Sequence, residues 1–198
     1  GEASGDESGH SVSLSSDGSI VAIGARYNDG NGSNSGHVRI YEWNGSAWVQ
    51  RGSDINGEAA GDESGSSLSL SSDGSIVAIG AKYNGGNGNA SGHVRIYQYA
   101  GDSWTKKGND IDGEAVNDRS GTSVSLSSDG LTVAIGATYN DGNGSNSGHV
   151  RIYEWDGSAW AQKGGDIDGE AAVNNSGFSV SLSSDGSIVA IGATWNDD

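Results

Sequence analysis

Oxygen-bearing side chains alternate with glycine in the run DGNGS, which occupies residues 29–33 and returns at residues 141–145. Alternating oxygen ligands of this kind begin the loops with which many proteins bind Ca²⁺. The intermediate copy of the run has Gly85 in place of the aspartate, and no copy supplies the bidentate glutamate that closes such loops. We therefore favour a flexible polar loop over a calcium site. The candidate metal ligands in these runs are Asp29, Asn31, Ser33, Asp141, Asn143 and Ser145.

A second group of acids, Asp110, Asp112 and Glu114, lies in the segment DIDGE and is a further candidate for holding Ca²⁺. The same acids return at residues 166–170. Closely spaced acids are also typical of solvated turns, and we favour that interpretation here. Calcium is thus a candidate cofactor, and the sequence establishes none.

Acceptor triplets for N-linked glycans recur in the polar segments. Asn89 follows Asn87-Gly88 and destroys the triplet found at that place in other copies, yet it begins a new triplet with Ser91. Each complete long loop therefore keeps an acceptor. We expect glycosylation there if the protein is secreted by a eukaryotic route; the alternative is chance in a chain rich in Asn, Gly and Ser. The acceptors are Asn31, Asn44, Asn89, Asn143 and Asn174.

Catalytic motifs are absent from the sequence. His37, His93 and His149 each open the same predicted strand, and we expect packing or capping roles for them rather than metal binding. No serine lies in a Gly-x-Ser-x-Gly elbow. Every acid has counterparts elsewhere in the chain, whereas an active site needs only one constellation. We therefore predict that the protein is not an enzyme.

Tryptophan side chains at strand spacing are candidates for stacking on sugars, although aromatic residues so placed more often form core. The candidates are Trp43, Trp48, Trp104, Trp155 and Trp160.

All these groups belong to one unit that repeats every 56 residues. The run SLSSDGSIVAIGA occurs at residues 13–25, 69–81 and 181–193, and with two changes at residues 125–137. A fixed period of this size indicates a repeat architecture. We predict a single array over residues 1–198, with about 3.5 units. The expected units are 9–64, 65–120, 121–176 and a half unit at 177–198.

Within one unit the pattern predicts four antiparallel strands at residues 11–15, 20–25, 37–43 and 47–52. Val12 and Leu14 alternate with serine in the first strand, whereas the second is apolar on both faces and should be buried on both. Asp-Gly and Asn-Gly pairs are tight hairpin signals. Small residues on the first strand and bulky or cationic residues on the last match the taper of a β-propeller blade.

The predicted fold is therefore all-β, a propeller or partial propeller of four-stranded blades. An open solenoid of hairpins and a sandwich are the alternatives. Because strand direction alternates, the short turns should lie at one end of each unit. The long acidic loops should lie together at the other end, which is the expected place for any binding.

Motifs in each unit resemble the FG-GAP repeat of integrin α-subunit propellers. They are GFSVSL at residues 177–182, Asp185-Gly186, VAIGA at residues 189–193, and GHVRIY at residues 36–41. The other units lack the phenylalanine of Phe178. WD40 repeats are also similar around Ser-x-Asp-Gly, but their units are shorter. The resemblance implies an extracellular propeller with calcium between the first two strands. Here that loop shrinks to residues 15–18, which is too short to surround an ion.

A net charge of −16 makes nucleic acid and anionic membranes poor partners, and no apolar run is long enough for membrane insertion. Because residue 1 and the last residue both fall within expected loops, we expect a piece of a longer repeat protein. Our hypothesis is a non-enzymatic structural, adhesion or surface-display module, extracellular or at the cell surface. Its expected partners are further blades or other copies. The alternative is a calcium-dependent module that binds carbohydrate or protein through the long loops.

Overall fold

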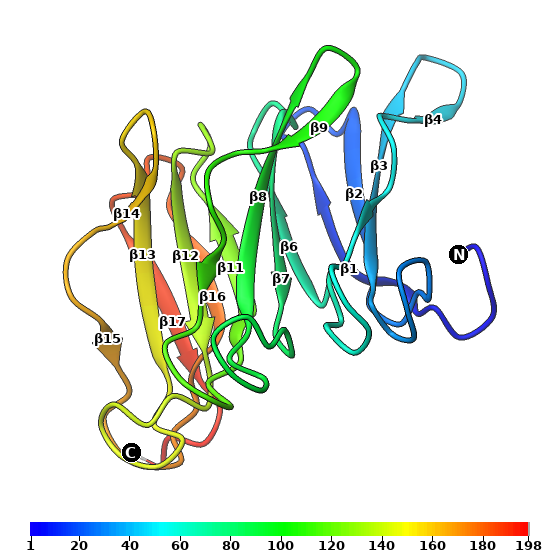
Figure 1. The fold of residues 1–198 in the computed structure, drawn as a ribbon. Helices are drawn as coiled ribbons and strands as arrows, with labels where there is room; N and C mark the ends of the chain where they lie inside the picture. Colours follow the sequence, from blue (N-terminus) through cyan, green and yellow to red (C-terminus); the bar gives the residue numbers. More distant parts are fainter. Residues whose placement is uncertain (198) are drawn as a thin grey trace.

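The first unit forms one antiparallel sheet in the computed structural model, which describes residues 1–197 (Figure 1). Neighbouring strands pair in chain order. The end of the third strand pairs with the fourth strand, and its beginning pairs with a short fifth strand. The strands are β1 (Ser8–Leu14), β2 (Ile20–Ala25), β3 (His37–Trp43), β4 (Trp48–Gln50) and β5 (Ile55–Asn56).

Two further sheets repeat this arrangement, and a two-stranded sheet follows them. The second sheet contains β6 (Ser67–Leu70), β7 (Ile76–Ala81), β8 (His93–Ala100), β9 (Ser103–Lys106) and β10 (Ile111–Asp112). The third contains β11 (Ser120–Leu126), β12 (Thr132–Ala137), β13 (His149–Trp155), β14 (Trp160–Gln162) and β15 (Ile167–Asp168), and the fourth contains β16 (Ser176–Leu182) and β17 (Val189–Ala193). The fold is a partial propeller, as predicted. The described residues contain no helix, and so none that is long and apolar enough to cross a membrane.

The predicted fourth strand at residues 47–52 is partly wrong. β4 is only three residues long, and the chain leaves it at Gly52, whose φ of 76° is a left-handed conformation. The chain then returns to β3 as β5, a strand of two residues. Two residues are too few to show a periodic pattern, which is why this strand is missed from the sequence.

Serine on the first strand of each complete unit joins neighbouring sheets. Ser11 Oγ donates to the carbonyl of Gly65 at 2.7 Å, and Ser13 Oγ accepts from the amide of Leu70 at 3.1 Å. The same pairs of bonds recur at the next two junctions. A side chain at Gly24 would overlap the Gly65 carbonyl oxygen, so only glycine allows this close approach. The first strand of each complete unit therefore carries small side chains, because its serines hydrogen-bond to the next sheet across the junction.

The apolar core lies between successive sheets. Ile20, Val38 and Ile40 of the first sheet form one cluster with Val77 and Ile79 of the second. The alternate residues of β7 point the other way and pack with the third sheet, so every residue of that strand is buried. This confirms the expectation from its doubly apolar pattern.

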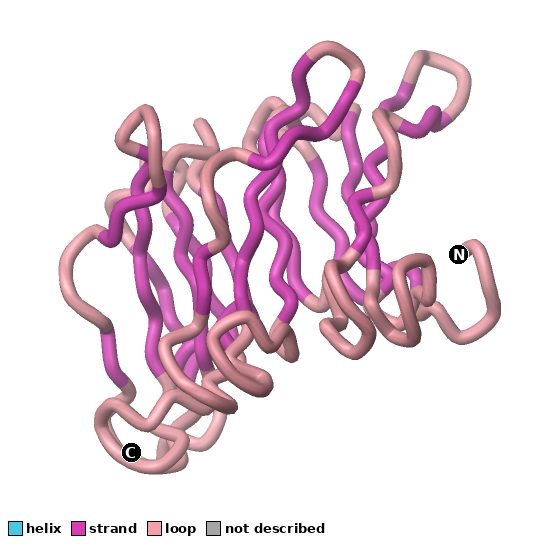
Figure 2. Tube along the Cα trace, viewed as in Figure 1, coloured by secondary structure: helices cyan, strands magenta, loops and turns pink. Residues whose placement is uncertain are grey.

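Long and short connections lie at opposite ends of the sheets (Figure 2). The turns β1–β2 and β3–β4 meet at one end, where the amide of Trp43 donates to the carbonyl of Ser19 at 2.8 Å. The long loops meet at the other end, where the amide of Ser64 donates to the carbonyl of Ser35 at 3.0 Å. We call the surface formed by residues 26–36 and 57–66, with their counterparts in later units, the loop face.

Candidate functional site

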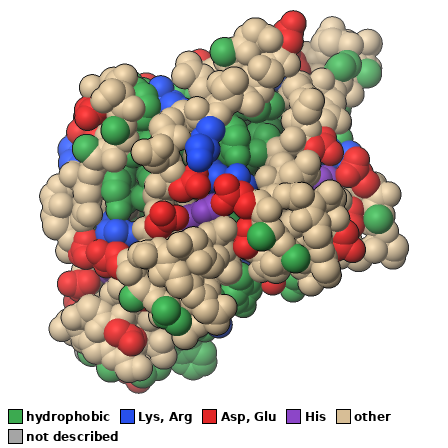
Figure 3. Space-filling view, in the orientation of Figure 1, with side chains coloured by type: hydrophobic (Ala, Val, Ile, Leu, Met, Phe, Trp, Pro, Cys, Tyr) green, Lys and Arg blue, Asp and Glu red, His purple; other side chains and the backbone are tan. Residues whose placement is uncertain are grey.

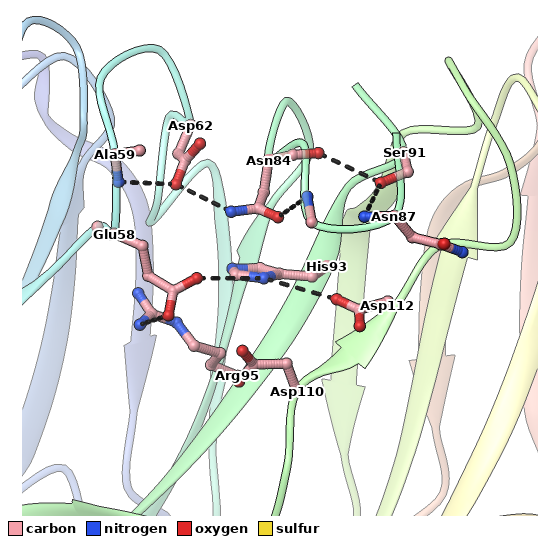
Figure 4. A network of polar contacts seen from close by, with 12 residues as sticks. Glu58, Ala59, Asp62, Asn84, Asn87, Ser91, His93, Arg95, Asp110 and Asp112 are labelled. Carbon is pink, nitrogen blue, oxygen red and sulfur yellow. Dashed lines mark hydrogen bonds and ion pairs between the residues drawn. The ribbon is translucent and has the colours of Figure 1, made fainter. Parts of the chain in front are cut away.

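Buried Asn–Asp pairs hold the loop face together. Asn84 Nδ2 donates to Asp62 Oδ2 at 3.0 Å, and Asn84 Oδ1 accepts from the amide of Gly86 at 2.8 Å. Asp62 also accepts from the amide of Ala59 and is only 4% exposed (Figure 4). The first and third units contain the same pair. In the last unit Asn174 replaces the aspartate.

The DGNGS run closes a loop through its polar side chains. Asp29 Oδ1 accepts from the amide of Asn34 at 2.8 Å, and Asn31 Nδ2 donates to the carbonyls of Gly57 and Glu58, both at 2.9 Å. Asn143 and Asn87 make the same contacts with the following loop, although the Asn87 copy lacks the aspartate. These bonds favour the polar-loop interpretation of Asp29, Asn31 and Ser33 and of their counterparts Asp141, Asn143 and Ser145.

The five glycan acceptors differ in exposure. Asn31, Asn44, Asn89 and Asn143 all lie on the surface, and the turn at Asn44 uses its Oδ1 rather than the Nδ2 that a glycan would occupy. Asn31 and Asn143 have Nδ2 bonded to the adjacent loop. The expectation for Asn174 is corrected, because this residue is 6% exposed and leaves no room for a glycan in the folded chain.

The β1–β2 turn does not fit the calcium ion that the FG-GAP resemblance implies there. Asp17 Oδ1 accepts from Ser15 Oγ at 2.7 Å and from the amide and hydroxyl of Ser19 at 2.9 and 2.8 Å. These bonds, led by that from Ser15, lower the pKa of Asp17 to about 2. One carboxylate that is already engaged in its own turn cannot surround an ion.

Acid should weaken the fold through these turn aspartates. Between pH 3.8 and about 2 the unfolded chain binds the proton of Asp17 more tightly than the folded chain does, so stability falls as the pH falls. Asp185 in the last unit has the same lowered pKa, also about 2. The Asp17→Asn variant should show a shallower loss of stability when urea unfolding is measured from about pH 5 to about pH 2. Identical slopes for the variant and the parent chain would contradict this assignment.

A buried histidine meets two carboxylates beneath the loop face in every complete unit. His93 Nδ1, at the start of β8, lies 3.9 Å from Glu58 Oε2 and 4.0 Å from Asp112 Oδ1. Asp110, just before β10, completes a group whose ligand atoms all lie within 4.8 Å of one another. The groups are Glu2–His37–Asp54, Glu58–His93–Asp110 and Glu114–His149–Asp166, and we call them the His–carboxylate clusters.

The charge state of these clusters follows from burial. His93 is 2% exposed, and loss of solvation, assisted by Arg95, lowers its pKa to about 4. The imidazole is therefore neutral at pH 7. Arg95 Nη1 lies 3.2 Å from Glu58 Oε1, the oxygen that faces away from the histidine. In Figure 3 the visible histidines lie in recesses lined by acidic side chains.

The sequence alone predicts only packing or capping roles for the histidines, and it places Asp110 and Asp112 in one group with Glu114. These clusters are therefore not found from the sequence. The structure divides those acids between two clusters, with Asp110 and Asp112 beside His93 and Glu114 beside His149. The available signal was that glutamate, histidine and aspartate recur together at the same step of 56 residues.

Residues 1–41 and 111–153 match the family model described as the FG-GAP repeat. The chain contains FG-GAP repeats. The matched segments cover strands β1 and β2 with most of β3 in the first unit, and their counterparts in the third. The resemblance seen in the strand motifs is thus confirmed.

Two solved structures share the fold of these FG-GAP repeats. A candidate 6-phosphogluconolactonase from Bacteroides uniformis aligns with a TM-score of 0.60 at 13% identity, over 92% of this chain and 46% of that protein. A candidate 6-phosphogluconolactonase from Bacteroides fragilis aligns with a TM-score of 0.57 at 11% identity, over 91% of this chain and 40% of that protein. The chain spans less than half the length of either. No curated protein sequence matches it significantly.

Tryptophans on the outer strands of the units join neighbouring sheets. Trp104 Nε1 donates to the carbonyl of Arg51 at 2.7 Å, and Trp160 Nε1 donates to that of Lys107 at the same distance. The Trp155 and Trp160 rings lie 5.5 Å apart, and Lys107 covers the Trp155 ring. The corresponding pair in the first unit, Trp43 and Trp48, is 43% and 45% exposed. Sheet-to-sheet packing therefore explains Trp104 and Trp160 without a sugar ligand.

Proposed function

We propose that this chain is a non-enzymatic structural module of an extracellular or cell-surface protein, built as a row of FG-GAP blades for adhesion or display. The observation that supports this most is repetition. The buried Asn–Asp pairs and the His–carboxylate clusters recur in every complete unit, with the same partners and nearly the same distances. A catalytic site needs one constellation of acid, base or nucleophile, and the described residues offer none that belongs to a single unit.

Further blades or other copies of the chain are the proposed partners. The first sheet presents a hollow of about 490 Å³, lined by Leu14, Val21, Ile23 and Trp48 among others. The counterpart of this face in the second sheet packs on the sheet before it, where Val77 is fully buried. A further sheet of the same repeat type would therefore fit against this open face of the first sheet. Nucleic acid does not suit a net charge of −16.

An activity assay tests the non-enzymatic assignment. The two structural neighbours are candidate lactonases, so 6-phosphogluconolactone is the substrate that offers the strongest challenge. We expect the purified chain to hydrolyse it no faster than buffer does. Acceleration above the buffer rate that is lost when His93 is changed to Gln would overturn the proposal.

A second candidate function is binding of carbohydrate or protein by the loop face. The observation in its favour is the density of acidic and amide side chains there, including the exposed acceptor Asn89. A glycan array probed with and without calcium separates the two candidates. A scaffold gives no glycan signal, whereas a calcium-dependent binding module gives a signal that EDTA removes.

A further inference from the structure

We propose that each His–carboxylate cluster binds one divalent transition-metal ion of the zinc class, so that the chain holds three such ions. In the second unit the ligands are His93 Nδ1, Glu58 and Asp110. The counterparts are His37 with Glu2 and Asp54, and His149 with Glu114 and Asp166. This inference is independent of the proposed scaffold function.

Unpaired histidine nitrogens point into these clusters. His37 and His149 are each 1% exposed, and the Nδ1 atom of each is buried without a hydrogen-bond partner. His37 Nδ1 faces Glu2 Oε2 at 3.7 Å and Asp54 Oδ2 at 3.8 Å, which is too far for a hydrogen bond. Buried polar atoms are nearly always paired, so an unpaired one requires an explanation. A bound metal ion supplies the missing partner.

The spacing of the ligand atoms suits a small ion. Zinc binds histidine nitrogen and carboxylate oxygen at about 2.0–2.2 Å, which places tetrahedral ligands about 3.4 Å apart. The three clusters have His Nδ1 to glutamate Oε2 distances of 3.7, 3.9 and 3.7 Å. A contraction of a few tenths of an ångström brings these atoms to tetrahedral spacing. The glutamates can make this move because they are exposed side chains.

The kind of donor selects the class of metal. One neutral imidazole with two carboxylates suits zinc and similar transition metals, whereas calcium and magnesium prefer sites made of oxygen alone. Two carboxylates also bring negative charge to the cluster. Arg95 neutralises part of it through Glu58 Oε1 and leaves Oε2 directed at the histidine. An outer partner that orients a ligand in this way is common at metal sites.

A metal ion at this place would tie two units together. Glu58 belongs to the connection that leads from the first sheet to the second, whereas His93 opens β8 and Asp110 directly precedes β10 in the second sheet. The ion would therefore anchor the connecting loop to the blade that follows. Because binding favours the folded chain, it should raise the melting temperature.

Calorimetry with Zn²⁺ on the EDTA-treated and dialysed chain tests the proposal. We expect three zinc ions per chain, little or no heat with Ca²⁺, and a higher melting temperature in the presence of zinc. The His93→Gln variant should bind two ions. The matched control is His10→Gln, because His10 is the histidine outside the clusters, and this variant should still bind three.

Glu58→Gln provides a second variant that should fold normally, because its side chain is 44% exposed. We expect it to melt like the parent chain without metal and to bind only two zinc ions. No zinc binding by the parent chain would overturn the proposal. Binding with the same stoichiometry in the parent, His93→Gln and Glu58→Gln chains would also overturn it, as would a preference for Ca²⁺.

Discussion

The Ile79→Ala substitution is expected to lower the free energy of unfolding by about 2–5 kcal/mol. Ile79 is 1% exposed and lies in β7, in the apolar layer between the first and second sheets. Removing its outer carbons loses their burial and leaves a cavity, because the backbone around it is held by strands on both sides. Urea unfolding followed by tryptophan fluorescence measures the change.

Ile23 offers a matched control within the same local sequence, IVAIGA. It occupies the position in β2 that Ile79 occupies in β7, but its side chain faces the open hollow of the first sheet. We expect the Ile23→Ala variant to lose about 1 kcal/mol or less at low protein concentration. Equal losses at the two positions would contradict the assignment of an open first sheet.

The Gly92→Ala substitution is expected to cost about 3 kcal/mol or more, because two penalties combine. Gly92 has a φ of 73°, a conformation that residues with a Cβ atom rarely adopt. The added methyl group would also overlap the backbone carbonyl of Ser120, at the place where the loop of one unit meets the start of the next. We expect a large fall in the urea midpoint or a chain that does not fold.

Gly101 separates these two penalties. It lies in the β8–β9 turn with a φ of 56°, and a Cβ atom there would meet nothing within 4 Å. The Gly101→Ala variant should therefore cost only about 1 kcal/mol, from backbone conformation alone. If both alanine variants lose the same stability, the close contact between Gly92 and Ser120 has no energetic role.

Local signals were sufficient for the second and third strands of the unit, whereas β1 begins at Ser8 rather than at the predicted residue 11. The bounds of β2 and β3 agree with the prediction, because each strand has a continuous apolar or alternating pattern and a tight turn beside it. The order of strands and turns also predicted which connections lie at the same end of the sheets, because strand direction alternates along a meander. The outer strands were harder, because β5 has only two residues and pairs with β3 beyond the end of β4.

The His–carboxylate clusters depend on contacts between residues far apart in the chain. Glu58, His93 and Asp110 meet only because one sheet's outgoing loop passes beside the next sheet's third strand. Nothing in the local sequence of any one of them indicates the other two. The same reasoning applies to Asn174, which has a glycan acceptor triplet but is buried by its surroundings.

The sequence by itself determined the period, the strand patterns and the turns, because these depend on neighbours a few residues away. The tertiary structure decided which identical residues are buried. Val21 and Val77 have the same neighbours in the chain, yet Val77 is fully buried between two sheets and Val21 lines the hollow of the first. The physical reason is that an apolar face gains stability only when another sheet covers it. Likewise, candidate ligands become a metal site only when the fold brings their atoms within reach of one ion.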